Sequence, residues 1–180
     1  MKHRILLATA ALCASLASAQ AQTLFTLTFE PEGGGGRTGT GSGTLTLNGT
    51  TITFGDLSFS GMSGTMTLAH IHGPSGEFPA TAGVLYNMAP FITLGADSKS
   101  GTVSGSFSLV DNPNNRGFTV AQQLDQLNTG QWYFNIHTAP NFGGGEIRAQ
   151  LVLVPEPSVM ALLILGGIAV SGAYLRRRRS

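Results

Sequence analysis

The central part of this 180-residue chain consists of short runs in which Thr, Val, Ile and Phe alternate with small residues, separated by glycines. A period of two places successive side chains on opposite faces of a strand, so this pattern favours β structure over helices. The clearest signal is the run from Leu45 to Phe54, which contains Asn48-Gly49. Asn-Gly favours a two-residue type I′ turn, and such a turn places Leu45 opposite Ile52. The pattern predicts an all-β fold, an antiparallel β-sandwich or Greek-key barrel.

Further strands are expected wherever the same alternation recurs: Leu24–Phe29, Leu57–Ser60, Thr65–His72, Gly83–Tyr86, Thr102–Val110, Gln131–His137 and Glu146–Val154. One short helix interrupts this series. Thr119 has the side chain of an N-cap, and the three apolar residues that follow at helical spacing share one face. They are Val120, Leu124 and Leu127, and the run Asn128–Gly130 is expected to end the helix.

The first 19 residues have the organisation of a secretory signal peptide. Lys2 and Arg4 precede a mostly apolar stretch that is too short to cross a bilayer, and Ala17-Ser18-Ala19 fits the small-residue pattern read by signal peptidase. Cleavage after Ala19 is therefore expected. The single cysteine, Cys13, lies in this segment, so the mature protein is expected to contain neither thiol nor disulfide.

The C-terminal region, residues 155–180, is predicted to be a sorting or membrane-anchoring tail. Residues 158–175 are uncharged and long enough to cross the hydrocarbon core of a membrane as a helix. The arginines that follow are expected to keep the C-terminal end in the cytoplasm. The order of a Pro-Glu-Pro motif, an apolar span and an arginine cluster resembles the PEP-CTERM sorting signal. The motif residues are Pro155, Glu156, Pro157, Arg176, Arg177, Arg178 and Arg179. The resemblance implies an inner-membrane precursor, recognition by an exosortase-type enzyme and delivery to the cell surface or extracellular matrix.

Between these two segments, residues 20–154 are expected to form one domain of mildly acidic charge. Four basic residues stand against eight carboxylates there, a net charge of −4, because six of the ten basic residues lie in the terminal segments. A nucleic-acid-binding domain would instead carry a basic surface. Nucleic acid is therefore not an expected partner, whereas exopolysaccharide or other surface proteins are.

Two segments combine histidine with other polar residues: Ala69-His70-Ile71-His72-Gly73-Pro74, and Asn135-Ile136-His137-Thr138 with Gly145-Glu146-Ile147-Arg148. With the Gly- and Thr-rich hairpins before them, these segments resemble the CHRD domain, named for its repeats in chordin and also found in secreted bacterial proteins. The likeness covers residues 23–153. It implies a compact extracellular β domain and brings no established activity or catalytic residues.

The histidines also suggest a metal site. Residues i and i+2 share a strand face, so His70 and His72 lie together, and a third ligand from a neighbouring strand would complete a site for copper or zinc. His137 is the candidate, and Glu146 is expected to ligate the ion or to orient a ring. Protons should compete with the ion below about pH 6.5.

Three functional classes stay open at this point. The first is a structural or interaction protein of the surface or matrix, in which Glu146, Arg148 and the histidines only satisfy one another and fix strand register. The second is a metal-binding or redox domain that uses the histidines. The third is an enzyme acting on matrix polysaccharide, although the sequence contains no GxSxG motif or P-loop and predicts no catalytic residue.

Overall fold

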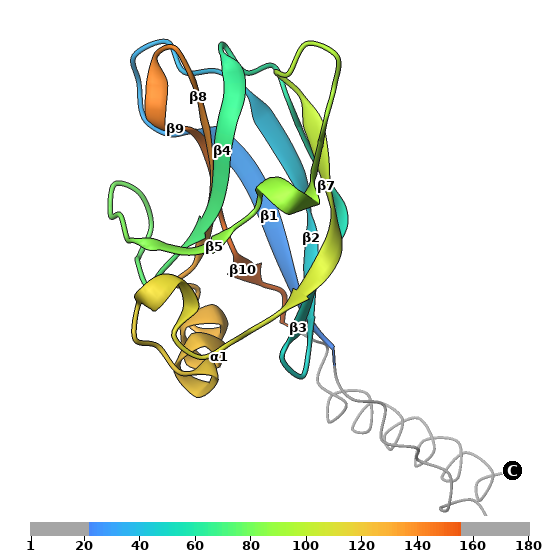
Figure 1. Ribbon diagram of the computed structural model, residues 1–180, viewed down its shortest axis with the longest axis vertical. Helices are drawn as coiled ribbons and strands as arrows, with labels where there is room; N and C mark the ends of the chain where they lie inside the picture. Colours follow the sequence, from blue (N-terminus) through green and yellow to red (C-terminus); the bar gives the residue numbers. More distant parts are fainter. Residues whose placement is uncertain (1–21, 156–180) are drawn as a thin grey trace, which may run out of the picture.

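The computed structural model describes residues 22–155, which form an antiparallel β half-barrel with one short helix (Figure 1). The ten strands are β1 Thr23–Pro31, β2 Thr40–Asn48, β3 Thr51–Ser60, β4 Thr65–His72, β5 Val84–Asn87, β6 Ile92–Leu94, β7 Gly101–Ser108, β8 Tyr133–Ala139, β9 Phe142–Gln150 and β10 Val152–Leu153. Two single-turn helices, Ala89–Phe91 and Pro113–Asn115, lie in the connections.

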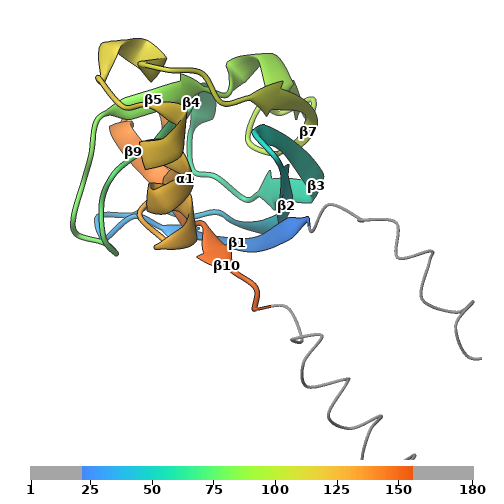
Figure 2. The ribbon, with the colours of Figure 1, turned by 90° about the horizontal axis from the view of Figure 1, so that it is seen from below.

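The strands follow one continuous path in the order β5-β4-β8-β9-β1-β2-β3-β7-β6, and β10 pairs with β1. The expected antiparallel all-β class and its sandwich-like arrangement are confirmed, and β1 takes part in both halves, so that the strands follow one curved path. Seen from below in Figure 2, the sheet bends round so that β4 and β5 come to lie across from β1 and β2. This curvature gives the sheet a concave side, which encloses the core, and an outer side.

The β2–β3 hairpin differs from the sequence prediction by two residues in register. Leu47 pairs with Ile52 and Leu45 pairs with Phe54, so the turn residues are Gly49 and Thr50. Gly49 has a φ of +60°, whereas Asn48 is not among the residues with positive φ. A positive φ at the first turn position is the feature of a type II′ turn, which glycine adopts without steric cost. A register shift of two residues leaves each side chain on the face of the sheet that was predicted for it, and Leu45 and Ile52 are both fully buried.

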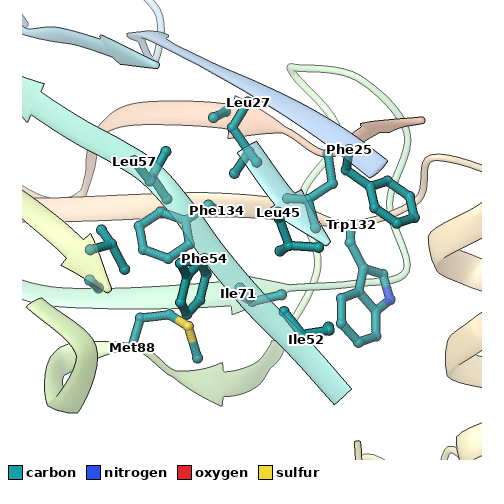
Figure 3. Close-up of a cluster of buried hydrophobic side chains, with 14 of the residues drawn as sticks. Phe25, Leu27, Leu45, Ile52, Phe54, Leu57, Ile71, Met88, Trp132 and Phe134 are labelled. Atoms are coloured by element: carbon teal, nitrogen blue, oxygen red, sulfur yellow. The ribbon is translucent and has the colours of Figure 1, made fainter. Parts of the chain in front are cut away.

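The concave side holds the apolar core shown in Figure 3. Alternate residues of β1 fill it, since Phe25, Leu27 and Phe29 are each at most 1% exposed. The Phe134 ring of β8 packs edge-to-face on Phe29, with centroids 5.3 Å apart. The same alternation that buries these side chains sends the intervening residues of each strand to the outer side.

Helix α1, Val120–Asn128, lies at one end of the half-barrel (Figures 1 and 2). The predicted cap is confirmed, because the Thr119 side chain accepts from the Gln122 amide in a capping box. Leu127 is fully buried, and Gln126 accepts a hydrogen bond from the indole of the buried Trp132 at 3.0 Å. These contacts fix the helix against the start of β8.

Within residues 22–155, no helix has the length and apolar character needed to span a membrane. The predicted signal peptide, residues 1–19, and the predicted transmembrane helix, residues 158–175, lie outside the described part of the chain.

Candidate metal centre

The three predicted histidines meet on the outer side of the sheet. His70 and His72 project from β4, opposite to the buried Ile71, and His137 projects from the adjacent strand β8. His70 Nδ1 lies 3.2 Å from His137 Nε2, and one ring nitrogen from each histidine lies within 4.8 Å of the others. Nitrogens that each bind one ion at about 2 Å are at most about 4 Å apart, so a small movement of the rings is enough to bring all three to a shared ion. Strand pairing thus brings His137 to the His70 and His72 pair, although His137 lies 67 residues after His70 in the sequence.

Two of the rings are oriented by backbone carbonyls. His72 Nδ1 lies 3.0 Å from Ala82 O, and His137 Nδ1 lies 2.9 Å from Gly143 O. Because a carbonyl only accepts, each Nδ1 carries the hydrogen. In this tautomer His137 Nε2 accepts from His70 Nδ1. Metal-binding histidines are commonly fixed by such a hydrogen bond from the nitrogen that does not bind the ion. His72 Nε2 is buried and has no hydrogen-bond partner among residues 22–155.

The electrostatic surroundings keep the rings of β4 neutral. Burial lowers the pKa of His72 to about 4, helped by the nearby His70, His137 and Arg148, although its hydrogen bond to Ala82 acts in the opposite direction. The pKa of His70 is also lowered, first by burial and then by His137. Only neutral imidazole binds a metal, so both rings have their ligand form at neutral pH.

Tyr133 and Arg148 close the site on the side of His72. The Tyr133 ring is stacked on the His72 ring, with centroids 4.8 Å apart and 5° between the planes. The Arg148 guanidinium lies 3.5 Å from the Tyr133 ring centroid. Since β8 lies between β4 and β9, His72 and Arg148 approach Tyr133 from opposite sides.

Arg148 also holds down the segment between β4 and β5, residues 73–83, which we call the cover segment. Its guanidinium donates to Ala80 O at 2.6 Å and to Gly76 O at 2.9 Å, and it lies 3.8 Å from the Glu32 carboxylate. We call the following outward residues the polar layer: His70, His72, Tyr133, Asn135, His137, Glu146, Arg148 and Glu32. Its histidines at positions 72 and 137, its arginine and Glu146 are at most 9% exposed.

Glu146 belongs to the polar layer but not to the histidine cluster. Its Oε1 accepts from the backbone amides of Ser63 at 2.6 Å and Thr38 at 3.2 Å, and its Oε2 accepts from the Thr138 hydroxyl and the Gly64 amide. The structure therefore does not place this carboxylate at the three rings, and Gly143 O, instead of Glu146, orients His137. The reason is that three loop amides and a hydroxyl satisfy both oxygens.

Sequence reasoning missed several groups that form the site. The two orienting groups, Ala82 O and Gly143 O, are backbone atoms, for which no side-chain pattern exists. Tyr133 had a usable signal, because Tyr133, Asn135 and His137 alternate along one strand and must share a face.

The clefts among residues 22–155 include three of about 450, 210 and 470 Å³. None of them is lined by two carboxylates, the pair on which most glycoside hydrolysis depends. They supply no observation in favour of the polysaccharide-hydrolysing alternative.

Fold and site together define a class of protein: an antiparallel β domain with an apolar core on the concave side and a buried, histidine-bearing polar layer on the outer side. A family model described as "CHRD domain" matches residues 13–151. The match covers more than half of the chain, so the chain belongs to the CHRD domain family. Searches of curated proteins and of solved structures gave no match. CHRD domains are typical of extracellular or secreted proteins, which suggests an extracellular or periplasmic location.

Proposed function

We propose that this protein is an extracellular metal-binding domain that takes up Cu²⁺ or Zn²⁺ through His70, His72 and His137. The observation that carries the proposal is the convergence of three ring nitrogens within 4.8 Å. Two of the rings also direct their Nδ1 hydrogens to carbonyls, so that His72 Nε2 is left without a hydrogen-bond partner among residues 22–155 and His137 Nε2 faces His70 Nδ1, the bond that an ion would replace. Imidazole ligands favour copper and zinc over Ca²⁺ and Mg²⁺, and copper binds the more tightly of the two.

Calorimetric titration of the full chain, purified in mild detergent without chelator, tests this proposal. We expect one Cu²⁺ or Zn²⁺ ion per chain. The double variant His70→Ala, His72→Ala should bind at least about 100-fold more weakly, because one remaining imidazole cannot hold the ion. A matched control is Ser104→Ala, Ser106→Ala, an exposed i, i+2 pair on β7 that should leave the affinity unchanged. Equal weak binding by wild type and the histidine variant would return these residues to a structural role.

We further propose that export and sorting bring the domain to the cell surface. The supporting observations are sequence features: the signal-peptide pattern of residues 1–19 and the Pro155-Glu156-Pro157 motif ahead of an apolar span and Arg176–Arg179. The protein itself is then a surface or matrix component, with an exosortase-type enzyme as its processing partner.

Mass spectrometry of the surface or secreted protein from an exosortase-containing host tests the sorting proposal. We expect an N-terminus near Gln20 and loss of the tail near Pro155–Pro157, because both positions carry the processing patterns described above. Intact Arg176–Arg179 on the mature surface protein would contradict sorting and indicate a plain membrane anchor. The same protein from a host without exosortase provides the control.

A further inference from the structure

The three histidines form the whole set of strong metal ligands that converge within residues 22–155. Glu146 is held by loop amides and Thr138, and Glu32 is held by Arg148 and Asn135. Cysteine is absent from the described range. Zinc sites usually have four ligands, and a site with three protein ligands completes the set with water or an exogenous molecule. A metal at these histidines therefore has one coordination position that the chain does not fill.

Access to the cluster differs from one histidine to the next. His72 and His137 are 9% and 7% exposed, and Tyr133, Arg148 and the cover segment close the site on the side of His72. His70 is half-buried and lines a cleft of about 450 Å³, large enough for a small molecule. The other lining residues are Val84, Leu85, Tyr86, Asn87, Val110, Pro113 and Asn114.

The walls of this cleft indicate what kind of ligand would enter. Apolar and amide side chains line it, and no charged side chain is among its lining residues. A bound divalent ion beside His70 would therefore supply the positive charge that an entering molecule meets. Charge of this kind attracts anions, and it does so more strongly at a partly desolvated site.

We propose that the metal held by His70, His72 and His137 has an open coordination position, and that a small anion binds there through the cleft beside His70. This inference rests on the proposed metal-binding function. With an open position, the metal site would bind a second ligand, whereas a closed structural site would not. Asn87, the residue directly opposite His70 in the β4–β5 pairing, then lies at the entrance.

Azide added to the copper-loaded full chain tests the open position. We expect a saturable azide-to-copper charge-transfer absorption and a changed electron paramagnetic resonance spectrum, because azide replaces solvent at the ion. The route is tested with Asn87→Trp, which should weaken azide binding at least about tenfold by filling the cleft. Copper affinity should stay within about threefold of wild type in this variant, since the three ligands are retained.

Leu94→Trp is the matched control. Leu94 is 40% exposed, lies on β6 at the other edge of the sheet and does not line the cleft, so azide binding should be retained. Val110→Trp, on an exposed wall of the same cleft, should repeat the effect if Asn87→Trp does not fold.

Three results would contradict the proposal, and each would overturn a different part of it. A wild-type chain that binds no copper contradicts the metal-binding function itself, and metal analysis establishes this before azide is added. A copper-loaded chain whose spectra do not respond to azide overturns the open position. Azide binding weakened by Leu94→Trp and not by the two cleft variants overturns the cleft as the route.

Discussion

Replacing Glu146 by glutamine is expected to lower the melting temperature by about 10 °C. The carboxylate is fully buried and accepts hydrogen bonds on both oxygens. A glutamine side chain of the same size places an NH₂ group against donors such as the amides of Ser63 and Gly64 or the Thr138 hydroxyl. Hydrogen bonds to a buried charged group each contribute about 1.5–3 kcal/mol, so a net loss of about 3 kcal/mol is expected.

The Glu146 effect should depend on pH in a defined direction. Burial by itself raises the pKa of this carboxyl, but hydrogen bonds from Thr138, Ser63 and Thr38 outweigh it and hold the pKa below the ordinary 4.5. A folded-state pKa below the unfolded value means that the stabilisation is fully present above about pH 4.5 and is lost as pH falls through the folded-state pKa. The difference in melting temperature between wild type and Glu146→Gln should therefore narrow on acidification.

Thermal unfolding followed by circular dichroism at pH 7 and at lower pH measures both effects. Glu30→Gln is a suitable control, because Glu30 is an exposed glutamate on the neighbouring strand β1. It should change the melting temperature by less than about 2 °C. A Glu146→Gln variant as stable as this control would show that the loop amides contribute little to holding the fold.

Saturating Zn²⁺ should raise the melting temperature of the wild-type chain by roughly 10 °C. An ion that binds the folded state at about 1,000 times its dissociation constant adds about 4 kcal/mol to the free energy of unfolding. The ion would join β4 to β8 through His70 and His137, which are contributed by different strands. The same concentration of Mg²⁺ should have no effect, since that ion prefers oxygen ligands.

His137→Ala should abolish the zinc-induced rise, measured against the melting temperature of the same variant without zinc. Asn141→Ala, at an exposed position in the hairpin that follows β8, should keep the full rise. An unchanged rise in His137→Ala would place the bound ion elsewhere on the chain.

Local sequence patterns predicted those features of the fold that depend on neighbouring residues. Thr65–His72 was predicted as a strand with the bounds that β4 has, because eight residues of alternation identify it. The capped helix beginning after Thr119 was also predicted correctly. Strand β6, Ile92–Leu94, was missed because three residues at a sheet edge carry too little pattern. Leu57–Ser60 was predicted as a separate strand, but a bulge between Phe54 and Leu57 joins it to β3.

Of the site, only the features that follow from strand geometry could be predicted. The i, i+2 spacing of His70 and His72 indicated a shared face, and the structure brings His137 to them. The surroundings of Glu146 were not predictable, because its donors come from loops more than 80 residues away as well as from Thr138. No sequence pattern shows which loop amides will donate to a carboxylate. From the sequence alone, a carboxylate bound by such amides therefore cannot be distinguished from one that is available to a metal ion.

The cover segment has a consequence for how long an ion stays bound. Its exposed part, residues 76–81, is held to the sheet by the hydrogen bonds from Arg148 to Gly76 and Ala80. At its ends, Ser75 donates to Gln131 O, and Ala82 contacts His72 and Tyr133. Segments with few apolar contacts open at a lower free energy than the whole domain. Such an opening would remove the Ala82 carbonyl that orients the His72 ring and would let solvent reach the ring while the apolar core stays closed. Dissociation of the ion should therefore be much faster than global unfolding, with a lifetime set by this segment.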